Sequence, residues 1–77
     1  MSKNTIEECI TRSLEKYFRD LGDETPTRIY DMVMLTVERP MLESVMKRAQ
    51  NNQSLASEML GINRNTLRKK LQQHGLL

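Results

Sequence analysis

Apolar and small side chains recur along the first part of this chain at the three- and four-residue spacing of one helix face. Between residues 6 and 21 that face consists of Ile6, Cys9, Ile10, Ser13, Leu14, Tyr17, Phe18 and Leu21. Thr5 and Glu8 have the spacing of a capping box, and Gly22 stands where a left-handed C-cap is wanted. The pattern therefore predicts a first helix over residues 6–21.

A second helical pattern runs over residues 29–49, and Thr25 or Thr27 can supply its N-cap. Pro40 interrupts this pattern. Proline has no amide to donate, and its ring collides with the carbonyl four residues back. We therefore expect a kink near Arg39 rather than the end of the helix.

This second helix is apolar around much of its circumference, through Met32, Met34, Leu35, Leu42 and Met46 in addition to its main face. A chain of 77 residues buries only about 60% of the surface that it exposes when unfolded. A single cysteine excludes an internal disulfide, and one cysteine with one histidine cannot form a typical structural zinc site. We therefore expect residues 1–49 to be the dimerisation helices of a homodimer, without metal or cofactor.

The last third of the chain predicts two short helices joined by a tight turn. Polar residues 50–53 break the preceding pattern, and a helix of about residues 53–60 follows. Gly61, Ile62 and Asn63 form the turn, with Asn63 as N-cap of a last helix. That helix is expected to bury Leu67 and Leu71 and to end at His74 and Gly75. Such a pair describes a helix-turn-helix. Since no segment shows strand-like alternation, we predict one all-α domain over residues 1–77, with four helices per subunit and a helix-turn-helix over residues 50–77.

The net charge of +2 is unevenly distributed. Residues 1–46 carry six basic and nine acidic side chains, a balance of −3, whereas residues 47–77 carry six basic side chains against Glu58, a balance of +5. This asymmetry predicts a polyanionic partner for the basic half. Two interpretations remain open: a DNA-binding protein, or a small helical regulatory module whose basic helix binds an acidic protein partner or RNA.

Residues 61–71, Gly-Ile-Asn-Arg-Asn-Thr-Leu-Arg-Lys-Lys-Leu, closely resemble the C-terminal signature of the Fis family, the bacterial factors for inversion stimulation. Residues 14–18 and 37–42 resemble that family too, and the similarity covers roughly residues 6–77. It implies a nucleoid-associated homodimer whose first two helices intertwine. Fis-like dimers hold their recognition helices closer than one turn of B-DNA, which implies bending of double-stranded DNA and a preference for an A/T-rich site centre.

The resemblance also implies individual roles. Base contacts would come from Asn63 and Arg64, whose forked donors match base edges in the major groove. DNA-backbone contacts would come from Asn52, Ser54, Thr66, Arg68, Lys69 and Lys70. The chain departs from the family pattern at Asn51, where glycine is usual, although asparagine also accepts left-handed geometry. It departs again at Gln50, Gln72 and Gln73, positions that are basic in a member of the family. Only five residues precede the first predicted helix, so we expect no N-terminal arm of the kind that stimulates invertases.

Other functions lack support in the sequence. It shows no nucleophile set, no paired carboxylates of a cleft and no glycine-rich phosphate loop, so we expect neither an enzyme nor a small-molecule substrate. We expect Cys9 to be a small core residue, and His74 to be a helix cap or a solvated side chain. No apolar run is long enough to cross a membrane or to act as a signal peptide, which favours the cytoplasm. The resemblance to the Fis family implies the nucleoid as the location within it.

Overall fold

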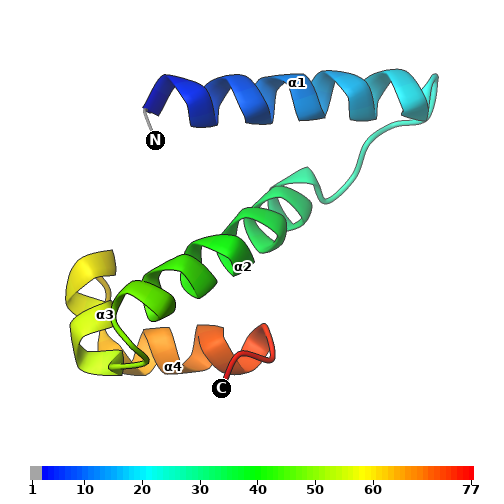
Figure 1. The fold of residues 1–77 in the computed structure, drawn as a ribbon. Helices are drawn as coiled ribbons and strands as arrows, with labels where there is room; N and C mark the ends of the chain where they lie inside the picture. Colours follow the sequence, from blue (N-terminus) through cyan, green and yellow to red (C-terminus); the bar gives the residue numbers. More distant parts are fainter. Residues whose placement is uncertain (1–2) are drawn as a thin grey trace.

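The computed structural model describes residues 3–77 and contains four helices (Figure 1). They are α1 (Lys3–Leu21), α2 (Ile29–Arg48), α3 (Gln53–Leu60) and α4 (Arg64–Gln73). These described residues include no strand, so the prediction of an all-α fold is confirmed.

Helix α1 ends as its sequence predicts but starts earlier. Gly22 has φ 66°, and its N–H donates to the carbonyl of Phe18 at 3.3 Å. The predicted start at Ile6 was wrong, because α1 begins at Lys3 and Thr5 lies inside its first turns. No glycine or proline separates these positions, so the helix continues past the residue that could have capped it.

The start of α2 also differs from the prediction. Neither Thr25 nor Thr27 is its N-cap; that position is taken by Arg28, which has a left-handed backbone with φ 57°. The guanidinium of Arg28 forms an exposed ion pair with Asp31 at 3.1 Å. The helix then continues through Pro40 to its last residue, whereas the kink expected there stays a prediction.

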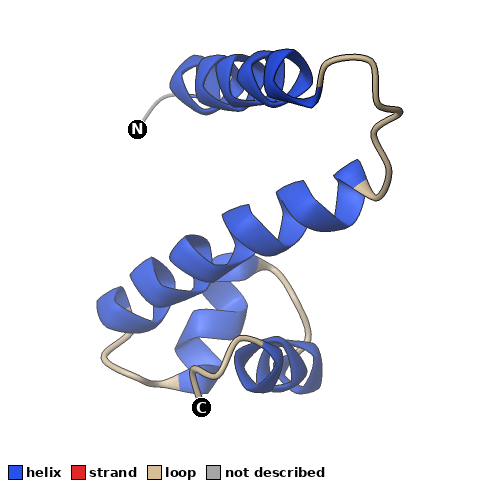
Figure 2. Cartoon of the chain, turned by 90° about the vertical axis from the view of Figure 1, so that its right-hand side faces the viewer, coloured by secondary structure: helices blue, strands red, loops and turns tan. Residues whose placement is uncertain are grey.

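The core lies between the C-terminal half of α2 and the two short helices. Its buried side chains are Leu42, Ala49, Ala56, Leu67 and Leu71. None of them belongs to α1, which lies on the other side of α2 from α3 and α4 in both views of the chain (Figures 1 and 2). Residues 42–77 therefore form the packed part of the subunit.

The other half leaves large apolar side chains exposed: Ile6, Phe18, Tyr30, Met32, Met34, Leu35, Val37 and Met41. An apolar groove also separates α1 from α2, lined on the α1 side by Ile10, Leu14 and Tyr17. Cys9 lines the same groove and is exposed in the single chain rather than buried in its core. A single subunit thus leaves the apolar faces of α1 and α2 without a cover.

Candidate nucleic-acid interface

The reversal of the chain between α3 and α4 follows from two local features. The side-chain oxygen of Asn52 caps α3 by accepting the N–H of Leu55 at 3.1 Å. At the other end of α3, Gly61 is left-handed with φ 73°, and its N–H donates to the carbonyl of Ser57 at 2.9 Å. Ile62 donates to the same carbonyl at 3.1 Å, which completes a Schellman turn.

Asn63 is the N-cap of α4, as predicted. Its backbone is extended, and its side-chain oxygen accepts the N–H of Asn65 at 2.7 Å. Because that oxygen is used by the helix, the side-chain amide nitrogen is the group that Asn63 can offer to a base edge.

Helix α4 has a buried face and a basic face. Leu67 and Leu71 pack into the core with exposed fractions of 0% and 1%. The remaining polar positions of the helix that are exposed include Arg64, Asn65, Thr66, Arg68 and Lys69. The structure thus brings four of the predicted DNA-contacting residues together on α4, while the exposed Asn52 and Ser54 lie at the start of α3.

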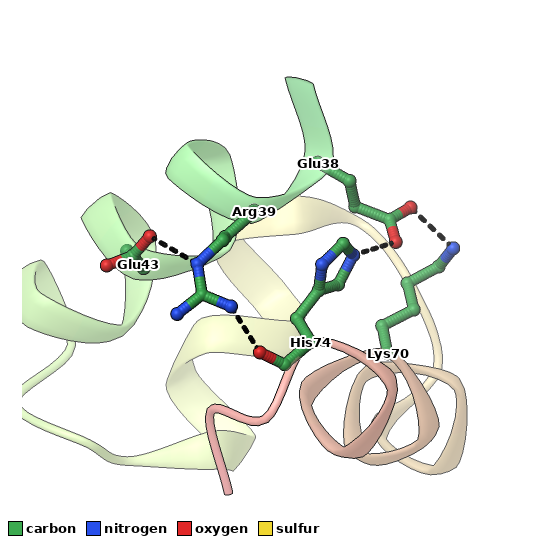
Figure 3. A network of polar contacts seen from close by, with 5 residues as sticks. All are labelled: Glu38, Arg39, Glu43, Lys70 and His74. Atoms are coloured by element: carbon green, nitrogen blue, oxygen red, sulfur yellow. Dashed lines mark hydrogen bonds and ion pairs between the residues drawn. The ribbon is translucent and has the colours of Figure 1, made fainter. Parts of the chain in front are cut away.

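Lys70 differs from the other predicted contacts, because its ammonium group is already engaged within the subunit. Its Nζ lies 2.8 Å from Oε2 of Glu38, and its side chain is only 34% exposed (Figure 3). The other carboxylate oxygen of Glu38 lies 2.9 Å from Nε2 of His74. Lys70 therefore faces α2 rather than the exposed basic face of α4.

A further hydrogen bond attaches the end of α4 to α2, and its donor, Arg39, also forms an ion pair within α2 (Figure 3). The guanidinium of Arg39 donates to the backbone carbonyl of His74, and its Nε lies 3.3 Å from a carboxylate oxygen of Glu43. His74 is the C-cap residue of α4, as expected, but its side chain is only 7% exposed and therefore not solvated.

The hydrogen bond from Lys70 lowers the pKa of Glu38 most strongly, and that from His74 lowers it further. Burial opposes both effects, but the pKa stays below its usual range. Glu38 is therefore the carboxylate partner of both side chains. We refer to Glu38, Arg39, Glu43, Lys70 and His74 as the α2–α4 network.

The turn between α2 and α3 contains two left-handed residues in succession. Asn51 has φ 64°, which confirms that asparagine takes the geometry for which glycine is usual. Gln50 has φ 54°, which its sequence did not predict. Both residues are exposed beside Asn52.

Residues 3–77 contain neither a candidate metal site nor a candidate membrane span. That part of the chain contains no group of three or more histidine, cysteine, aspartate or glutamate side chains that could hold a metal ion. None of its helices combines the length and the apolar character needed to cross a membrane.

Two short helices, a glycine turn and an exposed basic face on the second helix define a helix-turn-helix DNA-binding protein. The family model described as "Bacterial regulatory protein, Fis family" matches residues 35–74. The chain belongs to the Fis family, and it is a DNA-binding protein rather than an enzyme. The resemblance found in the sequence is thereby confirmed.

Similar proteins come from several bacteria. A Fis-like DNA-binding protein of Ralstonia nicotianae is 66% identical over 77 residues, which cover 100% of both chains. A Fis-like DNA-binding protein of Neisseria meningitidis serogroup B is 58% identical over 72 residues, 94% of this chain and 91% of the relative. The DNA-binding protein Fis of Glaesserella parasuis is 42% identical over 71 residues, 92% of this chain and 72% of the relative.

Proposed function

We propose that this protein is a homodimer that binds and bends double-stranded DNA, and that it acts in the bacterial cytoplasm as a nucleoid-associated regulator of transcription. The exposed basic face of α4 carries this proposal. Residues 47–77 hold six basic side chains and a single acidic one, Glu58, so the half of the chain that contains the helix-turn-helix attracts a polyanion.

The proposed contacts divide into base reading and phosphate binding. Asn63 and Arg64 stand at the start of α4, the end of a recognition helix that reaches base edges. Phosphate contacts are proposed for the exposed residues Asn52, Ser54, Thr66, Arg68 and Lys69. Lys70 is not included, because Glu38 already neutralises it.

The dimer is supported by what one subunit leaves uncovered. The core holds five buried apolar side chains, and α1 contributes none of them. Exposed apolar residues instead continue along α1 and the first half of α2. A second copy that covers these faces would supply the burial that a chain of this size needs. Two linked recognition helices then read neighbouring turns of DNA, and DNA that bends easily at an A/T-rich centre is preferred.

Fluorescence anisotropy tests this function with two labelled duplexes of about 27 base pairs that differ only in an A/T-rich or G/C-rich centre. Arg68 and Lys69 of two protomers provide four phosphate-binding cations, so the slope of log K against log salt is expected near −3.6, from about −0.9 per cation. Tighter binding to the A/T-rich centre with this slope supports a bending dimer. Binding that ignores the centre contradicts it, and would direct the search to RNA or to an acidic protein partner.

Two substitutions on α4 distinguish base recognition from sequence-independent phosphate binding. Arg64→Ala is expected to cost about 1–3 kcal/mol on a cognate site and to relax its specificity. Lys69→Ala is expected to weaken binding to every sequence about equally. Equal losses on cognate and random DNA for both variants would exclude Arg64 from base reading.

The oligomeric state is tested separately by sedimentation equilibrium at micromolar concentration. A mass of 18.0 kDa, twice the 9.0 kDa of one chain, is expected. A mass of 9.0 kDa would contradict the dimer.

A further inference from the structure

We propose that Glu38 limits the affinity of this protein for DNA of any sequence, because its carboxylate holds the charge of Lys70 against α2 and away from the phosphates. Glu38 is then a positioning residue: it acts through Lys70 and touches no DNA itself. The proposal rests on the DNA-binding role of α4 and adds to it the determinant that sets how many cations each subunit offers.

The position of Lys70 on α4 makes this arrangement possible. Leu67, Lys70, Leu71 and His74 follow one another at intervals of three, one and three residues, which places them on the side of the helix that faces the core. Lys69, its neighbour in sequence, is exposed on the basic face. Two adjacent lysines of the same helix thus have different surroundings.

The burial and the partners of Glu38 indicate that its ion pair with Lys70 persists when DNA binds. The side chain of Glu38 is 11% exposed, and each of its oxygens has its own partner, Lys70 at 2.8 Å and His74 at 2.9 Å. Salt screens a partly buried pair less than an exposed one. A phosphate that recruited Lys70 would leave the partly buried carboxylate of Glu38 with one partner fewer, which is costly. Lys70 therefore stays with Glu38 when DNA binds.

The backbone of α4 is fixed at the same place. Arg39, the residue after Glu38, donates to the carbonyl of His74 at the end of α4 (Figure 3). The side chain and the backbone of His74 are thus held by consecutive residues of α2. Since the leucines of α4 are buried as well, the helix cannot rotate to bring Lys70 onto its basic face.

The consequence can be expressed as a salt dependence. Release of Lys70 in both protomers adds two cations to a dimer, which makes the slope of log K against log salt steeper by about 1.8. Between about 50 and 200 mM salt, a protein with two extra cations loses roughly 12-fold more affinity than the wild type. The extra cations bind phosphates, so they strengthen binding to every sequence about equally.

The test uses the full chain on a random-sequence duplex, with anisotropy measured over that salt range. Glu38→Gln keeps the size of the side chain and removes its charge; we expect a slope steeper by about 1.8 and tighter binding at low salt. The double variant Glu38→Gln, Lys70→Gln is expected to return to the wild-type slope. Lys69→Gln is the matched control, with a slope shallower by about 1.8.

A Glu38→Gln slope equal to that of the wild type, at unchanged helicity by circular dichroism, overturns the proposal. If Glu38→Gln does not fold, the slope of Lys70→Gln is compared with that of Lys69→Gln. A Lys70→Gln slope within about half a unit of wild type supports the proposal, and a slope as shallow as that of Lys69→Gln overturns it. A merely structural role for Glu38 weakens binding and cannot steepen the slope. A wild-type protein without salt-dependent binding would contradict the DNA-binding function itself, whereas an effect of Lys69→Gln without one of Glu38→Gln contradicts only the role of Glu38.

Discussion

Asn63 has two functions at the start of α4, and two substitutions separate them. Its side-chain oxygen caps the helix at 2.7 Å from the N–H of Asn65, and its side-chain amide nitrogen is proposed to face a base edge. Asn63→Asp keeps an oxygen at the same place, and a carboxylate favours a helix N-terminus by about 0.3–1 kcal/mol. Asn63→Ala removes the cap, at a cost of about 0.5–2 kcal/mol. The free energy of unfolding is thus expected to fall for Asn63→Ala only.

DNA binding is expected to follow a different order. Aspartate at position 63 has no hydrogen to donate and adds a negative charge that faces DNA, so both contributions oppose binding. A lost base contact costs about 1–3 kcal/mol, which is roughly a 5- to 160-fold increase in Kd per half-site. Asn63→Asp should therefore bind cognate DNA worse than Asn63→Ala although it folds at least as well.

The assay combines urea unfolding, followed by circular dichroism, with anisotropy on a cognate and a random duplex. A stable Asn63→Asp variant that binds cognate DNA with the wild-type Kd would refute the reasoning, since Asn63 would then be a cap and nothing more. Losses of binding that parallel losses of stability across both variants would lead to the same conclusion.

Three further predictions concern stability. Leu67→Ala is expected to lower the free energy of unfolding in urea by about 2–5 kcal/mol, because the side chain is fully buried, whereas Leu77→Ala at a 56% exposed position should change it by less than about 0.5 kcal/mol; similar effects would contradict the assigned core. Gln50→Gly is expected to raise the midpoint of urea unfolding, with a gain of about 1 kcal/mol from relief of the left-handed backbone, and a lower midpoint would show that φ 54° carries no strain. The folded-state pKa of Glu38 is lowered, so its ion pairs stabilise the fold above the unfolded pKa of about 4.3 and lose that contribution as the pH falls through the folded pKa. An acid titration followed by circular dichroism should show this dependence reduced in Glu38→Gln, and identical titrations would refute it.

The features that the sequence predicted well depend on local chemistry. Glycine at positions 22 and 61 takes a positive φ without steric cost, so the ends of α1 and α3 follow from residue type. Asn63 caps α4 because its short side chain reaches the first free amides of the helix. The buried face of α4 follows from the spacing of Leu67 and Leu71.

The α2–α4 network depends on contacts that no local pattern contains. Glu38 lies 32 residues before Lys70 and 36 before His74. On a helix that is apolar around much of its circumference, a charged residue is expected to face solvent. One signal was present: Lys70 and His74 share a helix face with Leu67 and Leu71. That signal places two polar side chains toward the core, but their acidic partner follows only from the packing of α4 on α2.

The same packing determines how the helix-turn-helix is joined to the proposed dimer helices. Pro40 has no amide for the carbonyl four residues before it, so α2 lacks one backbone hydrogen bond near the middle of its length. Before Pro40, Glu38 and Arg39 of α2 contact the C-terminal end of α4. After Pro40, Leu42 enters the core that α2 shares with α4. Helix α4 is therefore attached to α2 on both sides of Pro40. These contacts restrict the direction of α2 at the point where it lacks a backbone hydrogen bond. Because α1 contributes nothing to the core, this segment of α2 is what fixes α4 relative to the proposed dimerisation helices. In the proposed dimer, the separation of the two α4 helices, and with it the proposed bend in DNA, would then depend on contacts that never touch the DNA.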